Sequence, residues 1–215
     1  MAASPIPPTL AVASLKTATP SARSRLLEIF PALANHSRDN EPDTLSYYFF
    51  NSTSEDDYAL YGFEAYPTKA ALMDVHAQSD VFKNFGATTQ KENLCAIDVD
   101  LFKPVGGFIL RSGETERPVE LIVINTFPSG SPVSGDRLKE YARYVEEEEK
   151  EGCPTFVVME NEKTGDIWTF ERYATREFYT RTHRASKAFG DLFGDAQAAP
   201  ATREFTEANL GFLLK

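Results

Sequence analysis

The chain has 215 residues, of which 42% are hydrophobic and 25% are charged, and its formal net charge is −10. This composition is typical of a globular protein with a core of ordinary size. The negative charge argues against nucleic-acid and anionic-membrane partners, because phosphate groups are bound by basic surfaces. The sequence has no run of about 18 apolar residues, so we expect no membrane-spanning helix and a cytoplasmic protein.

The first half of the chain predicts a strand at its start. Residues 9–17, TLAVASLKT, are mostly apolar or β-branched. The first 27 residues are also rich in Ser, Ala and Thr and contain no acidic residue, which is the composition of a transit peptide. We favour the strand, because the internal repeat described below requires one at this place.

The two halves of the chain predict the same order of elements, βαββαβ. In the first half, the strand is followed by a helix (21–36), two strands (45–51 and 58–66) joined by the turn STSEDD, a helix capped by Thr68 (69–82) and a last strand (95–102). The second half consists of a strand (119–127), a helix (136–149), two strands (155–161 and 166–173) joined by the turn KTG, a helix capped by Thr175 (176–189) and a strand within 203–215. The glycine-rich segment 104–118 is the predicted connector.

A long internal repeat supports this division. FEAYPTKAALMDVHAQSDVF, at 63–82, matches FERYATREFYTRTHRASKAF, at 170–189. Going backward, 45–51 corresponds to 155–161 and RLLE corresponds to RLKE. We therefore expect two domains, residues 1–110 and 111–215. The acidic run at 146–149 indicates a solvated helix end.

The repeated segment carries the candidate site. Glu64 and Tyr66 share one strand face, and His76 is expected on one helical stripe with Leu72, Val75, Ser79 and Phe82. The second copy has Glu171, Tyr173, His183 and Ser186 at the matching places. A half-buried histidine oriented by a carboxylate is suited to proton transfer near neutral pH. The same pair can also be a structural link between helix and strand, and its presence in both copies favours that interpretation.

Other chemistry is poorly supported by the sequence. Cys95 and Cys153 lack a metal-binding spacing and are predicted to be thiols of the core, and His36 is predicted at the surface. No P-loop, GxSxG or GxGxxG motif follows a strand. We expect no metal and no cofactor. Trp168 matches Tyr61 on the strand face opposite the glutamates, where core packing is its default role.

The pattern Phe-Glu-x-Tyr, a Thr-capped helix and His-x-x-Ser-x-x-Phe resembles the antibiotic biosynthesis monooxygenase (ABM) family. The resemblance covers both halves. It implies an α+β fold of two ferredoxin-like βαββαβ units in one chain, paired as a pseudo-dimeric α/β barrel, with further homodimerisation possible. Haem-degrading relatives ligate iron through a histidine late in the helix, and the corresponding positions here, near Phe85 and Leu192, cannot bind iron.

The resemblance also implies a function. Members of the monooxygenase branch oxidise phenolic polyketides with O2 in secondary metabolism, without metal or flavin. On that basis His76 and His183, with Glu64 and Glu171, are the candidate catalytic residues. The candidate contacts to a small aromatic substrate are Tyr66, Tyr173, Ser79, Ser186 and Trp168. Two alternatives stay open, a non-catalytic small-molecule binder of the stress-response kind and a cyclase or isomerase on the same scaffold.

Overall fold

The computed structural model describes residues 5–54, 57–194 and 199–215. Backbone contacts divide the chain into two compact units. The N-terminal unit consists of residues 7–101 and 208–215, and the C-terminal unit consists of residues 102–207 with residues 5–6. The first residues of the possible transit peptide, 1–4, and part of the predicted turn at 52–57 lie outside the described residues.

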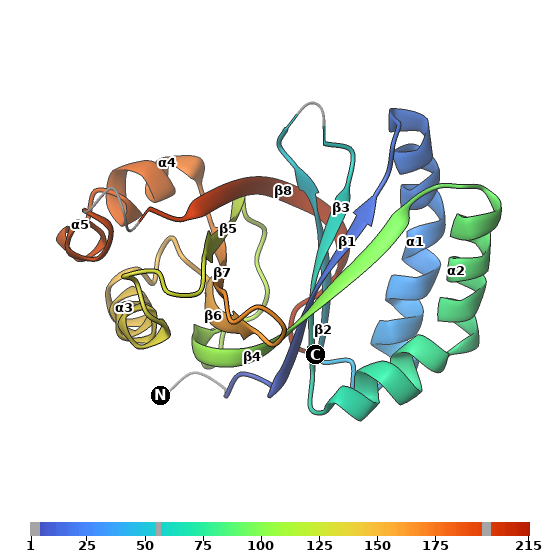
Figure 1. Ribbon diagram of the computed structural model, residues 1–215, viewed down its shortest axis with the longest axis horizontal. Helices are drawn as coiled ribbons and strands as arrows, with labels where there is room; N and C mark the ends of the chain where they lie inside the picture. The colour runs from blue at the N-terminus through green and yellow to red at the C-terminus, as the bar shows by residue number, and fades with distance from the viewer. Residues whose placement is uncertain (1–4, 55–56, 195–198) are drawn as a thin grey trace. The chain divides into compact units, whose positions relative to one another are not determined.

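The N-terminal unit has the predicted order of elements (Figure 1). They are β1 (Thr9–Lys16), α1 (Pro20–Asn40), β2 (Ser46–Ser52), β3 (Leu60–Tyr66), a π-helical turn η1 (Ala71–Val75), a 3₁₀ turn η2 (His76–Gln78), α2 (Asp80–Lys91) and the first part of β4 (Ala96–Phe108). Its strands follow the order β4-β1-β3-β2-β8. The helices α1 and α2 lie side by side and cover one face of this sheet.

The C-terminal unit repeats this arrangement. Its elements are β5 (Leu121–Phe127), α3 (Gly135–Glu148), β6 (Thr155–Asn161), β7 (Ile167–Tyr173), a short α4 (Arg176–Phe178), a π-helical turn η3 (Tyr179–His183), α5 (Lys187–Phe193) and β8 (Ala201–Phe212). Its strand order is β8-β5-β7-β6-β4. The long strands β4 and β8 each contribute residues to the sheets of both units. The expected α+β fold of two βαββαβ units is confirmed.

Three local predictions were wrong. The predicted connector begins later, because β4 continues through a register shift between Pro104 and Gly106 to reach Phe108. The helix after β3 is interrupted, because Ser79 is extended and its side chain caps α2 by accepting from the Phe82 N–H. The sequence alignment of 45–51 with 155–161 is wrong by one residue. Tyr47 pairs with Glu64, and Phe156 pairs with Glu171, which is the equivalent glutamate in the repeat. Tyr47 therefore corresponds to Phe156, one position earlier than in the alignment.

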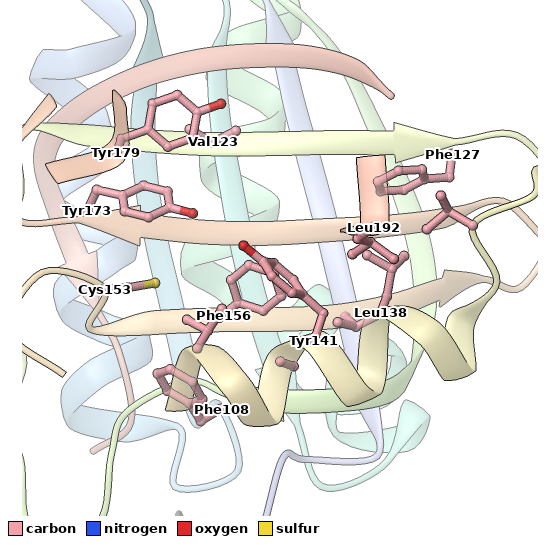
Figure 2. Close-up of a cluster of buried hydrophobic side chains, with 14 of the residues drawn as sticks. Phe108, Val123, Phe127, Leu138, Tyr141, Cys153, Phe156, Tyr173, Tyr179 and Leu192 are labelled. Carbon is pink, nitrogen blue, oxygen red and sulfur yellow. The ribbon is translucent and has the colours of Figure 1, made fainter. Parts of the chain in front are cut away.

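Each unit has its own hydrophobic core between its helices and its sheet. In the N-terminal unit, Leu26, Phe30 and Leu33 of α1 pack on Tyr47 and Phe49 of β2. In the C-terminal unit, Leu138, Tyr141 and Val145 of α3 pack on Phe156 and Tyr173 (Figure 2). These helical residues recur at three- and four-residue intervals, which places them on one face of each helix. Within the part of the chain that the structure describes, no helix is long and apolar enough to cross a lipid bilayer.

Candidate active site

A buried hydrogen bond between a histidine and a glutamate joins the two helical segments of the N-terminal unit. Glu41 is the residue that ends α1, and His76 lies where the π-helical turn passes into the 3₁₀ turn. The distance from His76 Nδ1 to Glu41 Oε2 is 2.7 Å, and the two residues are 1% and 3% exposed. Thr44 Oγ1 donates a hydrogen bond to the same carboxylate oxygen at 2.7 Å. This pair was not predicted, because the sequence pointed to Glu64 as the carboxylate that orients His76.

The environment keeps Glu41 ionised. Burial by itself raises the pKa of Glu41, but the hydrogen bond and the charge of His76, with smaller contributions from Thr44 and His36, bring that pKa below its ordinary value. An ionised carboxylate only accepts hydrogen bonds, so His76 donates through Nδ1–H. The lone pair of the neutral imidazole is then on Nε2.

A second carboxylate approaches the histidine from the sheet. Glu64, on β3, is 5% exposed and accepts a hydrogen bond from the Tyr66 hydroxyl at 2.8 Å. Burial raises the pKa of Glu64, and the charge of His76 and the Tyr66 hydroxyl only partly oppose this. Tyr47 lies opposite Glu64 on β2, with its ring centroid 5.1 Å from that of His76. Two glutamates with opposite pKa shifts therefore flank one imidazole.

These side chains border a cavity of about 310 Å³ within the N-terminal unit. Its volume is at the lower end of the range for small-molecule sites, about 300–1,000 Å³. The polar lining residues are Glu64, His76 and Tyr47. The remaining lining is apolar and comes from β1, α1, β2, η1, η2, α2 and β4: Ala13, Leu15, Phe30, Phe49, Leu72, Met73, Ala77, Phe82, Phe85, Ile97, Val99 and Leu101.

The C-terminal unit keeps the same histidine–glutamate contact. His183 Nδ1 lies 2.8 Å from Glu149 Oε2, and each side chain is 2% exposed. The prediction that the acidic run ends in solvent is therefore wrong for Glu149. Glu171 is also fully engaged, because it accepts hydrogen bonds from Tyr173, Thr169 and Asn125 at 2.6, 2.6 and 2.8 Å.

Aromatic rings fill the space around His183. The Tyr141 hydroxyl lies 3.4 Å from His183 Nε2, and the ring centroid of Tyr179 lies 5.8 Å from that of the histidine. Figure 2 shows the hydroxyls of Tyr141 and Tyr173 directed into the middle of this cluster. In the N-terminal unit the equivalent residues are smaller, because Leu33 precedes Glu41 by the same eight residues and Leu72 precedes His76 by the same four. The cavity beside His76 thus corresponds to a packed core beside His183.

A cation closes the end of each helix that carries the glutamate. Lys215 Nζ donates to the carbonyl oxygens of Ser37, Arg38 and Glu41 at 2.8, 3.0 and 2.5 Å. Arg111 does the same for α3, donating to the carbonyl oxygens of Val145 and Glu146. Arg111 is the last residue of GFILR (107–111), and Lys215 is the last residue of the matching segment GFLLK (211–215). This second repeat was not recognised from the sequence. Cations at helix C-termini are favoured by the helix dipole.

The other predicted residues have clear structural places. Ser79 and Ser186 cap α2 and α5 by accepting from Phe82 N–H and Phe189 N–H, at 3.2 and 3.0 Å. Trp168 packs its ring on Phe102, with centroids 5.0 Å apart, within the C-terminal unit. Glu41 and Glu149 were missed, although each precedes its histidine by a similar interval, 35 and 34 residues. In the described residues, no three His, Cys, Asp or Glu side chains converge as metal ligands.

The fold and this site define a class, a tandem of two ferredoxin-like units in which one unit has a cavity beside a buried His–Glu pair. Residues 8–88, within the N-terminal unit, match the model of the antibiotic biosynthesis monooxygenase (ABM) family. A search of proteins with curated function gave no match.

Solved structures of similar fold extend over both units. A candidate monooxygenase from Fusobacterium nucleatum is 16% identical, with 98% of each chain covered and a TM-score of 0.72. A candidate monooxygenase from Lactobacillus acidophilus is 14% identical, with 95% of this chain and 96% of that chain covered and a TM-score of 0.68. An anthrone oxidase-like protein is 13% identical, with coverages of 97% and 94% and a TM-score of 0.66. At these identities the likeness concerns the fold.

Proposed function

We propose that the protein is a monooxygenase that oxidises a small aromatic, polyketide-like molecule with O2 and requires no cofactor, and that the reaction takes place in the cavity of the N-terminal unit. The observation that carries the proposal is the ionised Glu41 behind His76 at the wall of an apolar cavity. The ABM match of this unit and the candidate monooxygenases of similar fold support the same class of reaction.

The first step is removal of a proton from the substrate. A phenol, or a ketone whose methylene group lies between two aromatic rings, forms a stabilised anion. His76 accepts the proton on Nε2, and Glu41 stabilises the imidazolium that results, as the carboxylate does in a Ser-His-Asp triad. Since Glu41 already accepts Nδ1–H, the imidazole is held in the tautomer that this step needs.

The second step is oxidation of the anion by O2. The electron-rich anion is itself the reductant, so the protein has only to orient it and exclude water. For a methylene that becomes a carbonyl, one oxygen atom forms the new C=O bond. The other oxygen atom leaves as water with the two hydrogens of the methylene. His76 and Tyr47 both line the cavity, and burial keeps the Tyr47 phenol protonated by raising its pKa; in the proposed reaction the imidazolium and this phenol stabilise the developing negative charge.

The test is oxygen uptake with anthrone as substrate, in the presence of EDTA and without added flavin. The matched variants are His76→Gln and His183→Gln, since each histidine is buried and bonded to a glutamate of its own unit, but only His76 lines the cavity. We expect His76→Gln to reduce turnover by at least about 100-fold and His183→Gln to leave turnover close to that of the wild type. Equal losses in both variants contradict the proposal.

Two other results of the same assay separate the alternatives. Product formation without oxygen uptake identifies an isomerase or cyclase. Saturable binding of anthrone without turnover in air identifies a binding protein. Either result refutes the oxidative mechanism.

A further inference from the structure

The cavity opens onto an apolar rim. Among the described residues, the exposed large hydrophobic side chains are Met73, Val75, Ile97 and Val99. Met73, Ile97 and Val99 line the cavity. Single exposed hydrophobic side chains are normal on a protein surface, but a group of them at the edge of a cavity marks a contact surface.

The lining of the cavity has a buried part and an exposed part. His76 and Glu64 are buried, as are Leu72 and Phe85 in the apolar wall. At the rim, Met73, Ile97 and Val99 are 54%, 42% and 49% exposed. A ligand that places its reacting group against His76 therefore has an apolar path to solvent.

The charges of the lining restrict the ligand further. Within the lining, Glu64 carries the carboxyl group and His76 the imidazole, and no lysine or arginine borders the cavity. A carboxylate or phosphate on the ligand would meet Glu64 and no lysine or arginine, and the one imidazole in the lining is already bonded to Glu41, which makes burial of that charge costly. The cavity is suited to an uncharged ligand.

We propose that the substrate is an uncharged phenolic or enolic molecule with an apolar alkyl substituent, and that this substituent leaves the cavity across Met73, Ile97 and Val99. This inference rests on the proposed function, and it adds the substrate class. The flexible thioether side chain of Met73 adapts to chains of different length. The substituent contributes affinity in proportion to the apolar area that it covers.

The test uses 2-methyl-, 2-propyl- and 2-hexylnaphthalen-1-ol and measures binding by calorimetry under anaerobic conditions, so that no oxidation takes place. We expect affinity to increase about fourfold for each methylene that contacts the rim, so that the hexyl compound binds at least about 30-fold tighter than the methyl compound. An analogue of the methyl compound with a carboxylate on the naphthalene ring, the part that enters the lining, should bind at least about tenfold more weakly.

The variant Met73→Gln/Ile97→Thr/Val99→Thr should reduce the gain from methyl to hexyl to less than about fivefold, with little change for the methyl compound. Val75→Thr is the matched control, because Val75 is equally exposed in the same helical turn but does not line the cavity. An equal gain in the triple variant and the wild type, or no binding of any naphthol, overturns the inference. Chain-dependent binding without oxidation in air supports it and refutes the proposed function instead.

Discussion

Replacing Glu41 by glutamine tests whether the buried pair serves catalysis or only the fold. Glu41 Oε2 accepts both hydrogen bonds, from His76 at 2.7 Å and from Thr44 at 2.7 Å. A glutamine whose amide oxygen occupies that position keeps both bonds, and its NH2 group replaces Oε1, which lies 3.6 Å from His36 Nε2. The substitution therefore removes the charge and preserves the contacts.

The expected cost in stability follows from the two bonds. A hydrogen bond to a charged group contributes about 1.5–3 kcal/mol and a neutral one about 0.5–1.5 kcal/mol, so two bonds lose about 2 kcal/mol together. For a chain of this size that corresponds to a decrease in Tm of about 4–8 °C. Glu149→Gln is the matched control, since Glu149 Oε2 contacts His183 at 2.8 Å in the C-terminal unit, where His183 does not line the cavity. We expect similar losses of stability in the two variants.

The expected effect on turnover differs between the two variants. Without the negative charge of Glu41 the imidazolium of His76 is not stabilised, and comparable losses in triads reach about 10⁴-fold in kcat. We expect a loss of at least about 100-fold in Glu41→Gln and none in Glu149→Gln, measured by oxygen uptake at saturating substrate with thermal denaturation alongside. If the two variants lose stability equally and both keep full turnover, the pair is structural and the mechanism is wrong.

Three further predictions concern pH, packing and backbone. Because the folded state raises the pKa of Glu64, its contribution to stability is present below the usual glutamate pKa and is lost as pH rises through the folded value; Glu64→Gln should be more favourable at pH 8 than at pH 4 in urea titrations. Tyr141→Leu should destabilise the protein by about 2–4 kcal/mol in the same titrations, since a large buried ring is lost. Gly211→Ala should lower stability by about 1–3 kcal/mol or more, because Gly211 has a φ of 95° and a Cβ would overlap the Tyr47 carbonyl oxygen; Gly86→Ala, in open space on α2, should instead stabilise by up to about 1 kcal/mol.

The order of elements was predictable because apolar residues recur with the period of each element. The β6 strand, Thr155–Asn161, was predicted to the residue, and β7 to within one residue, since turn residues bound both. Periodicity could not locate the break before α2. Ser79 fits the apolar stripe by spacing, but its hydroxyl caps a new helix instead, and Val75 is consequently turned to solvent. Local hydrogen bonding outweighed the hydrophobic pattern there.

The partner of His76 was not predictable from spacing along one element. Glu64 was favoured because it lies close to His76 in sequence. Glu41 ends α1, 35 residues before His76, and contacts the imidazole only because the chain folds back. Helix C-termini ordinarily favour cations, so a glutamate there has an adverse local environment. Lys215 offsets this by bonding the same helix end. The match of GFLLK with GFILR could have indicated a cation at each helix end, but both segments lie far in sequence from the histidine of their unit.

Duplication explains why the buried His–Glu pair alone does not identify an active site. Both units keep the carboxylate on Nδ1 of the histidine, at 2.7 and 2.8 Å, so this contact serves the fold wherever it occurs. The two units differ in the side chains next to the imidazole. The C-terminal unit has Tyr141 and Tyr179 there, and the N-terminal unit has leucines at the equivalent positions. Close packing needs those rings, because an empty apolar volume costs stability. A cavity kept open beside His76 therefore has a cost that the ring packing beside His183 avoids, and this difference is why we propose the ligand site in the N-terminal unit.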